Sequence, residues 1–417
     1  MKSFIKNSFI NNVATLIAGT SVAQLIPILI SPILTRIYSP EDFGLYATIV
    51  AISSVCAISS CLRYEYAIVQ EKNTEKAISL VKLSFYVCFI FSFLIFIAIL
   101  LFQNSITNFF NLEGLKTIIF LVPIIVLSLG LFKALNFWNT RTENYKNISL
   151  STVYQSLSVG GGQIVLKFSQ FGLLFGYIFG HFIGVLSLLL RTLKNDKRLF
   201  SSKTNYFQLK QVALKYKKFP LLSSPAAIAD SLSVQIPILL IVKSFSSSIA
   251  GFYSLTYRVL NLPATFFSQG IAQPLLKQIT KMDERSYEQV IFILKVCLSL
   301  SMIITPFILI IWFYAEDLFS FIFGSEWEEA GTYAKIIIFA VAIKFVVSPL
   351  SIIFTLDKNI KTGTIWQYCY LLTLSITLIS FSSKPINTFL IAFTVHEVLL
   401  YSLYLLMILK VSLPKYK

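Results

Sequence analysis

Long apolar segments separated by short polar turns follow one another along almost the whole chain. A helix of roughly 20 apolar residues is long enough to cross the hydrocarbon core of a bilayer. Lipid offers no hydrogen-bond partner to an open strand edge, so these segments are predicted to be helices. Twelve are predicted, near residues 11–35, 43–62, 78–102, 115–138, 149–168, 171–191, 219–243, 249–276, 288–314, 329–355, 362–382 and 385–410. The pattern therefore predicts an all-α polytopic membrane protein.

The composition supports this prediction. Hydrophobic residues make up 56% of the 417 residues and charged residues 13%, and the mean hydropathy is +0.76, which leaves too little polar surface for a soluble protein. The net charge of +16 comes from basic residues scattered over short turns, so no nucleic-acid partner is expected. The five cysteines form no CxxC pair, and neither a metal site nor a disulfide is expected. Residues 1–12 are too polar for a cleavable signal peptide.

One apolar stretch occurs twice. Gln24–Ile30 (QLIPILI) returns as Gln235–Ile241 (QIPILLI), displaced by 210 residues from Pro27 to Pro237, and Lys146–Ile148 returns as Lys358–Ile360, displaced by 212. Matches at a nearly constant displacement predict a duplicated chain. The predicted parts are an N-lobe at 1–191 (helices 1–6), a cytoplasmic basic linker at 192–218 and a C-lobe at 219–417 (helices 7–12). With six helices each, both halves enter the membrane from the same side, so the repeat is parallel.

The Lys and Arg residues predict the orientation of the helices. Placing both termini in the cytoplasm puts most of the 35 basic residues on that side, as the positive-inside rule requires. The linker holds many of them. Within it, six apolar residues recur at helical spacing: Tyr206, Leu209, Val212, Ala213, Tyr216 and Phe219. This pattern predicts an amphipathic helix whose apolar face lies on the anionic inner leaflet, with a plain solvated linker as the alternative.

Several short motifs, in order along the chain, resemble those of the Wzx-type polysaccharide flippases (O-antigen or capsule repeat-unit flippases). Leu34–Tyr46 (LTRIYSPEDFGLY) is similar to their first-helix exit, and Arg63–Glu65 is similar to the segment after their second helix. The start of their second half is matched by Tyr216–Pro220, Gln235–Pro237, Gly251–Tyr253, Arg258 and Pro263. That family belongs to the multidrug/oligosaccharidyl-lipid/polysaccharide exporter (MOP) superfamily.

The resemblance implies a fold of twelve transmembrane helices in two pseudo-symmetric six-helix lobes around a central cavity. It implies a substrate, an oligosaccharide repeat unit on undecaprenyl diphosphate, moved from the inner to the outer leaflet of the bacterial cytoplasmic (inner) membrane. Alternating access with proton or ion coupling and no cofactor is the implied mechanism. Membrane lipids and a polysaccharide polymerase complex are the further candidate partners.

A polar stripe on the eighth predicted helix indicates a water-filled lumen. Its members fall at steps of three or four residues: Ser254, Arg258, Asn261, Thr265 and Ser268. Charge in lipid costs about 2.5–3.5 kcal/mol on the insertion scale, so Arg258 must face protein or water. Lys295 and Lys344 are further candidates for a cationic lumen that faces a diphosphate or acidic sugars. The alternative is a structural Arg258 paired with a neighbouring helix.

Helices 1 and 7 carry the duplicated Gln and Pro. The amides of Gln24 and Gln235 can donate to and accept from sugar hydroxyls, and Pro27 and Pro237 each remove a backbone hydrogen bond, which suits a hinge. Helix–helix packing through polar residues is the alternative for both glutamines.

Asp230, Glu397 and His181 lie near the middle of predicted spans. Protonatable groups at that depth are candidates for coupling proton movement to conformational change. The alternatives are ion pairing of the acids with Arg258, Lys295 or Lys344, and a simple hydrogen bond for His181. Lys133 is placed nearer the membrane surface, where its side chain can reach water.

Two other classes of protein share this composition. A membrane glycan polymerase or ligase needs a large outer loop and clustered acids or a nucleophile–base pair, whereas the predicted outer turns are short and lack His. A drug exporter of the same superfamily has the same fold but is expected to have a more aromatic and acidic cavity. The sequence therefore favours a transporter that is not an enzyme.

Overall fold

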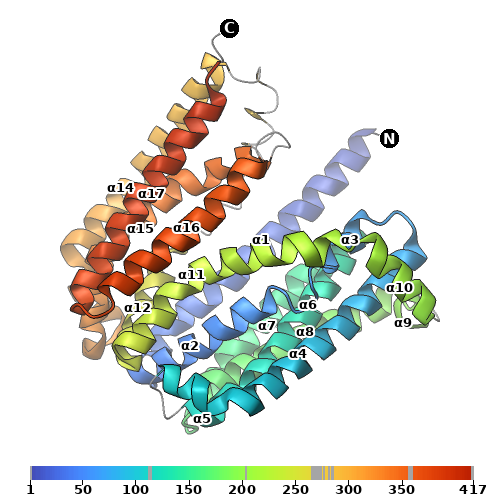
Figure 1. The fold of residues 1–417 in the computed structure, drawn as a ribbon, viewed down its shortest axis with the longest axis horizontal. Helices are drawn as coiled ribbons and strands as arrows, with labels where there is room; N and C mark the ends of the chain where they lie inside the picture. Colours follow the sequence, from blue (N-terminus) through green and yellow to red (C-terminus); the bar gives the residue numbers. More distant parts are fainter. Residues whose placement is uncertain are drawn as a thin grey trace. The chain divides into compact units, whose positions relative to one another are not determined.

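The computed structural model describes residues 2–110, 115–201, 204–263, 275, 278–279, 282, 286–355 and 360–414; for residues 2–17, 115, 200, 355, 360 and 361 it describes the backbone only. Lys358 and Asn359 of the duplicated tripeptide lie outside the described residues. Regular structure in these ranges is helical, with no strand (Figure 1). The chain divides into two compact units, Met1–Lys243 and Ser244–Lys417.

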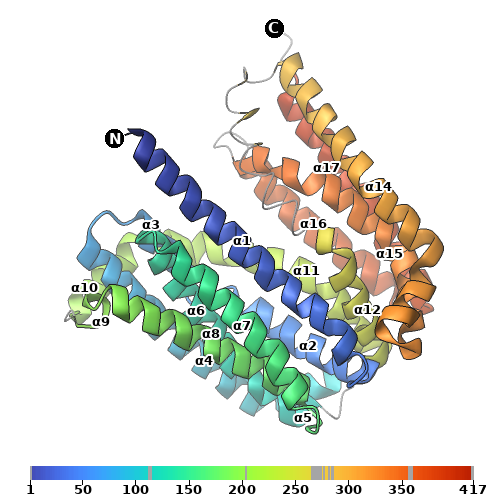
Figure 2. The same ribbon diagram turned by 180° about the vertical axis from the view of Figure 1, so that it is seen from behind.

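The first unit is a bundle of long helices. These are α1 (Lys2–Leu34), α2 (Pro40–Ala57), α4 (Thr74–Phe110), α6 (Val122–Arg141), α7 (Tyr145–Val165), α8 (Gly172–Asn195) and α11 (Ser224–Ser244). Short elements join them: α3 (Glu65–Gln70), α5 (Leu115–Ile118), η1 (Ile119–Leu121), α9 (Arg198–Ser201), α10 (Tyr206–Lys215) and η2 (Phe219–Ser223). Figure 2 shows the same bundle from behind, with α4, α6, α7 and α8 side by side.

The second unit contains α12 (Ser247–Leu260), α14 (Tyr287–Phe323), η3 (Ser325–Trp327), α15 (Glu328–Val347), η4 (Ser348–Thr355), α16 (Ile360–Phe381) and α17 (Ile386–Ser412). Within the described ranges, eleven of the twelve predicted spans correspond to long helices, whereas the span predicted at 249–276 begins as the 14-residue α12 and extends outside the described residues. Eight of the described helices are apolar and long enough to cross a membrane, and Ala18–Leu34 is a shorter apolar stretch.

The helix pairings support the duplication. In the first unit α4 packs on α6, α6 on α8, α7 on α8, and α2 on α6. The second unit repeats these pairings with α14 on α15, α15 on α17, α16 on α17, and α12 on α15. Helices α4 and α14 have 37 residues each, and α14 begins and ends 213 residues after α4. The units therefore share one helical frame, while the domain boundaries at 191 and 218 stay predictions, as does the central cavity.

Glycines on α8 allow it to approach α7 closely. They recur every fourth residue at Gly172, Gly176, Gly180 and Gly184, the spacing that small residues use at membrane helix interfaces. A Cβ at Gly176 would lie 2.4 Å from the backbone N of Gln163, and one at Gly180 would lie 2.4 Å from that of Val159. The two backbones therefore approach so closely that no larger side chain fits at either position.

Three segments differ from the prediction. The helix predicted at 78–102 continues as α4 to Phe110. The helix predicted at 43–62 ends at Ala57, and the following turn places Leu62 (φ 48°) and Arg63 (φ 64°) in the left-handed region, which disfavours larger side chains. The helix predicted at 288–314 continues as α14 to Phe323, and the chain reverses at Gly324 (φ 107°). Glycine adopts that φ without steric cost, whereas residues 315–323 include no Gly or Pro that would stop the helix earlier.

The amphipathic helix of the linker is present as α10, but the prediction of what covers its apolar face is wrong. Val212 is 1% exposed and belongs to a core cluster of the first unit with Tyr64 and Leu199, and Ala213, Tyr216 and Phe219 pack against that cluster. From Val212 onward, the face predicted to contact lipid therefore contacts the protein, whereas Tyr206 at its start is exposed. Helical periodicity identifies an apolar face, but it does not tell whether lipid or protein covers it.

Candidate functional site

A buried ion pair joins α15 to α17 in the second unit. Lys344 Nζ lies 2.7 Å from Glu397 Oε2, with side-chain exposures of 17% and 0%. The hydroxyl of Tyr370, on α16, donates to Glu397 Oε1 at 2.6 Å. Both charges were predicted site residues, and the structure brings them together. Removing one partner of such a pair costs about 3–5 kcal/mol because the other charge stays buried alone.

The surrounding helices hold this pair in place. Thr394, one turn before Glu397 on α17, donates to the carbonyl of Ile336 on α15 at 3.1 Å. His396 Nε2 lies 3.1 Å from Thr373 Oγ1 of α16. These two contacts join α17 to α15 and to α16, close to the Glu397 carboxylate. The pair therefore sits where three helices of one unit meet.

Aromatic rings enclose the ammonium group. Lys344 Nζ lies 5.5 Å from the ring centroids of Phe393 and Tyr401, within the range of a cation–π contact. The Tyr370 and Tyr401 rings meet edge to face at 6.0 Å, and the Trp366 ring stacks on the Tyr404 ring at 4.5 Å. Lys344 is thus stabilised by one carboxylate and by ring faces.

The polar stripe on α12 bonds mainly to its own helix. Ser254 Oγ donates to the Gly251 carbonyl at 3.0 Å, and Asn261 Nδ2 donates to the Tyr257 carbonyl at 2.8 Å. Arg258 is half-buried and has an interaction partner. Thr265 and Ser268 lie outside the described residues. The assignment of this stripe to a lumen stays a prediction.

Lys295 is exposed and lies about two turns after the start of α14 at Tyr287. Its side chain is long enough to reach the end of the helix from there. Its predicted place in a lumen stays a prediction.

The duplicated stretch lies inside α1 and α11 in the first unit. Pro27 and Pro237 both lie within continuous helices, and Ser31 Oγ donates to the Pro27 carbonyl at 2.6 Å. Gln24 is half-buried, and no group of the described residues hydrogen-bonds its Oε1 atom. Gln235 is also half-buried. An amide oxygen without a protein partner suits water or a sugar hydroxyl, while the hinge and lumen roles stay predictions.

Asp230 is exposed on α11. The charge that acts on it most strongly is Arg63, which lies in the same unit, and not Arg258, Lys295 or Lys344. Arg63 Nε also donates to Ser223 Oγ at 3.4 Å, and the hydroxyls of Ser59 and Ser224 lie 2.6 Å apart. The turn after α2 therefore holds the start of α11.

His181 makes the simple hydrogen bond that was the alternative to coupling. Its Nδ1 atom bonds Gln155 Nε2 of α7, and the Tyr177 ring lies 4.2 Å from its own ring, centroid to centroid. Its role as a coupling group stays a prediction.

The sequence did not identify Glu65 as a site residue. Its side chain is 0% exposed, and no group of the described residues hydrogen-bonds either carboxylate oxygen. Burial raises the pKa of this carboxyl group, and the charges of Lys133 and Arg63 oppose that rise. Lys133 is half-buried and donates from Nζ to the Ala57 carbonyl at 3.1 Å. A turn with positive φ, a helix-end carbonyl that accepts from Lys133 and Ser60, and a buried acid thus meet at the end of α2.

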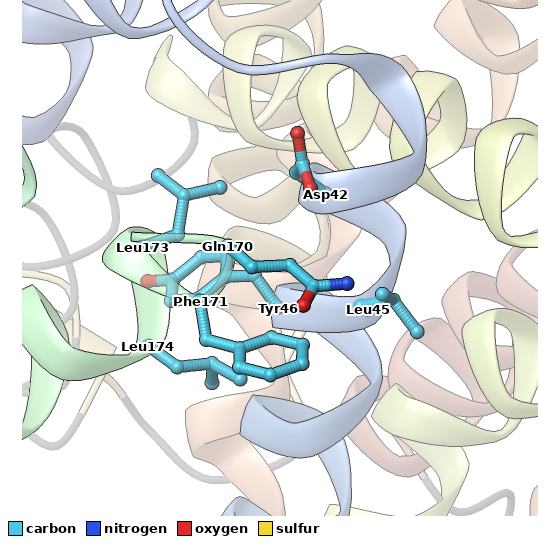
Figure 3. A pocket seen from close by; sticks show the side chains of 7 residues that line it. All are labelled: Asp42, Leu45, Tyr46, Gln170, Phe171, Leu173 and Leu174. Carbon is cyan, nitrogen blue, oxygen red and sulfur yellow. The ribbon is translucent and has the colours of Figure 1, made fainter. Parts of the chain in front are cut away.

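One small hollow lies between the start of α2 and that of α8. Figure 3 shows its lining, which is mostly apolar: Asp42, Leu45, Tyr46, Gln170, Phe171, Leu173 and Leu174. Its one acid, Asp42, accepts hydrogen bonds from the backbone N and the hydroxyl of Ser39 in a capping box. This hollow is part of the helix packing and has no free charge for a substrate.

The helical frame defines the class of protein. The chain has the fold of membrane transporters: it is similar to lipid II flippase MurJ in an inward closed conformation (TM-score 0.76, 14% identity, covering 95% of this chain and 89% of that chain). It is also similar to an inward-facing multidrug resistance MATE family transporter of the MOP superfamily (0.72, 14%, 95% and 98%) and to the Vibrio cholerae MATE transporter VcmN (0.63, 13%, 98% and 97%). These likenesses confirm the predicted fold class.

The chain belongs to the family described as polysaccharide biosynthesis protein. The family model matches residues 33–332, more than half of the 417 residues. No curated protein sequence matches the chain significantly.

Proposed function

We propose that the chain is a flippase that moves an undecaprenyl-diphosphate-linked oligosaccharide repeat unit, of O-antigen or capsular type, from the inner to the outer leaflet of the bacterial cytoplasmic membrane. One combined observation carries the proposal: membership of a polysaccharide biosynthesis family together with a fold similar to that of a lipid II flippase. The protein transports without covalent chemistry and without a cofactor, and both termini lie in the cytoplasm. Its partners are the lipid-linked substrate, membrane lipids and a polysaccharide polymerase complex.

The substrate headgroup enters a cationic lumen while its lipid tail stays in the bilayer. The diphosphate carries the negative charge that Arg258, Lys295 and Lys344 attract. Sugar hydroxyls exchange hydrogen bonds with the amides of Gln24, Gln235 and Asn261 and with Ser254. Bending of α1 and α11 at Pro27 and Pro237 then opens the cavity on the other side.

The Lys344–Glu397 pair is the first candidate for coupling. A diphosphate that approaches Lys344 competes with Glu397 for the same ammonium group, whose exposure of 17% leaves it accessible from one side. A buried carboxylate that loses its cation takes up a proton, so substrate binding and proton binding are linked at this pair. Asp230 and His181 are the second and third coupling candidates, and a sodium ion is the alternative to a proton.

Genetic complementation tests the proposed function. Deletion of the gene should abolish surface polysaccharide and leave the complete lipid-linked repeat unit on the inner leaflet, and the wild-type gene should restore export. Loss of repeat-unit synthesis in the deletion strain would contradict a transport step. Accumulation of translocated but unpolymerised units on the outer face would instead indicate a polymerase or ligase.

The likeness to MATE transporters supports a drug exporter as the second candidate. Drug susceptibility of the deletion strain separates the two candidates. In a background that already lacks the surface glycan for another reason, deleting the gene of a flippase should not change drug susceptibility, whereas deleting the gene of a drug exporter should raise it.

In the complementation assay, Arg258→Ala should fail to restore the glycan at normal protein level, and Asn261→Ala, one turn away, should restore part of it. Full export by Arg258→Ala would rule out the cationic lumen.

A further inference from the structure

Helix α10 is held against the first unit by a clasp at its C-terminal end. Lys215 Nζ bonds Glu71 Oε2, and the Tyr216 hydroxyl donates to the same oxygen at 3.1 Å. Burial opposes ionisation of Glu71, but the hydrogen bonds from Lys215, Asn73 and Tyr216 outweigh it and lower the pKa to about 2. The Tyr64 hydroxyl adds a bond to the Ala213 carbonyl at 3.3 Å. The C-terminal end of α10 is therefore bonded to the first unit along one side.

The clasp continues into the first turn of α11. The η2 turn begins four residues after Lys215, and its Phe219 ring stacks against Tyr66 at 6.4 Å. Ser223 and Ser224 then contact Arg63 and Ser59 of the turn after α2. Figure 1 shows α10 beside α3 at one end of the first unit. A force on α10 would thus be transmitted to the start of α11.

The opposite side of α10 is exposed and apolar. Phe207 is 70% exposed, Leu214 59% and Leu221 66%, and the exposed Lys210 and Lys217 lie between them. Within α10, Phe207, Lys210 and Leu214 follow one another at steps of three and four residues on one face, and the exposed Lys217 and Leu221 continue this apolar and basic surface past the helix end at Lys215. We name it the outward face. Tyr206, Lys218 and Leu222, all exposed, lie beside it.

Water is a poor solvent for this face. Contiguous exposed apolar side chains indicate a contact surface, and alternation of large apolar residues with lysines is typical of helices that lie in a headgroup region. The span Phe219–Ser244 begins where the outward face ends, and the span Gly172–Asn195 ends shortly before α10. The chain therefore cannot carry α10 far from the membrane surface.

We propose that the outward face of α10 binds the anionic headgroup region of the adjoining leaflet, the cytoplasmic leaflet in the proposed orientation, so that the start of α11 is held between lipid and the first unit. The lysines provide the charge complementarity, because anionic lipid attracts each basic residue near the surface. The outward face lies on the side of α10 opposite to Val212, whereas the sequence pattern predicts that the side containing Val212 contacts lipid. The inference depends on the orientation and not on the substrate.

Spin labelling in lipid nanodiscs tests the proposal. In a cysteine-free variant that retains complementation, a nitroxide at Leu214→Cys should be relaxed by oxygen more than by a water-soluble nickel chelate when the lipid contains phosphatidylglycerol. A label at Glu75→Cys, on the exposed first turn of α4, should show the opposite preference. Preference of the Leu214 label for nickel would show a water-exposed face, and protection from both reagents would show a protein cover. Either result overturns the proposal.

Charge reversal separates lipid attraction from apolar packing. The triple variant Lys210→Glu, Lys217→Glu and Lys218→Glu should reduce the oxygen-to-nickel relaxation ratio at Leu214 several-fold in phosphatidylglycerol, with little change in phosphatidylcholine. The control variant Lys194→Glu, Lys197→Glu and Arg198→Glu changes the net charge equally but lies before α10, and should leave the ratio unchanged. An equal effect of both triples would contradict binding by the outward face. The nitroxide readout does not need transport, so it stays interpretable if the proposed substrate is wrong.

Discussion

The two compact units place a lysine at the same point of the repeat and give it different partners. Lys133 in α6 and Lys344 in α15 lie 211 residues apart, the displacement that also separates Gln24 from Gln235. Lys344 makes a closed ion pair with Glu397. Lys133 instead donates to the carbonyl of Ala57 at the end of α2, with the buried Glu65 acting on it through space.

The two histidines of the chain repeat this comparison. His181 on α8 and His396 on α17 lie 215 residues apart, and each bonds a polar side chain on the preceding long helix, Gln155 or Thr373. The residue after His396 is Glu397, whereas Phe182 follows His181. Duplication thus kept the frame, the lysine and the histidine, and the position of the acid distinguishes the units. The second unit has a closed ion pair, and the first has a buried acid without hydrogen-bond partners among its described residues.

The largest expected effect comes from opening the pair in the second unit. Glu397→Gln leaves Lys344 buried without its anion and should lower the free energy of unfolding by about 3–5 kcal/mol. Thermal unfolding of purified protein in detergent measures the loss. The double variant Lys344→Met with Glu397→Gln removes both charges and should recover much of it. Equal losses in the single and double variants would show that the two residues do not act as a pair.

The close approach of α7 and α8 in the first unit gives the next largest effect. Gly180→Ala places a Cβ 2.4 Å from the Val159 backbone N and should destabilise the protein by about 3 kcal/mol. This value is near the top of the range for overpacking, because a backbone cannot move aside as a side chain can. Gly161→Ala is the matched control, since nothing lies within 4 Å of its Cβ position. Thermal stability should be unchanged or slightly raised there. Comparable losses of thermal stability in Gly180→Ala and Gly161→Ala would contradict the close approach of the two backbones as the cause of the effect.

Much of the frame was predictable because apolar length alone selects spanning helices, and the doubled QLIPILI stretch revealed the repeat. The break after Ala57 was not predictable: residues 57–64 contain no Gly or Pro to mark a turn, although Leu62 and Arg63 adopt positive φ. Lys344 and Glu397 were both recognised as buried charges, but their pairing depends on how α15 and α17 pack. Glu65 was not predicted as a site residue because it follows an apolar run and resembles a loop residue. Aligning Lys133 with Lys344 across the repeat would have indicated a buried charge site in the first unit.

Glu65→Gln tests whether the first unit truly lacks a closed pair. The amide keeps the shape of a side chain whose oxygens have no hydrogen-bond partner among the described residues, and it removes the cost of burying a charge. The lost attraction to Lys133 opposes that gain, so the net change in unfolding free energy should stay within about 1 kcal/mol. Thermal unfolding beside Glu397→Gln gives the comparison directly. A loss as large as that of Glu397→Gln would mean that Glu65 and Lys133 form a tight pair in solution.

The smallest expected effect concerns the Glu71 clasp, which lies outside the spanning helices. The pKa of Glu71 is lowered to about 2, so the stability it contributes is present above its unfolded value, near 4.5, and is lost as the pH falls from there toward 2. The mobility of a nitroxide at Leu214→Cys should therefore rise in the wild-type background over that window. In Glu71→Gln the label should be more mobile already at pH 7, with a weaker dependence on pH between 4.5 and 2. If the wild-type and Glu71→Gln backgrounds gave the same pH profile, the Glu71 carboxylate would not be what holds α10 to the first unit.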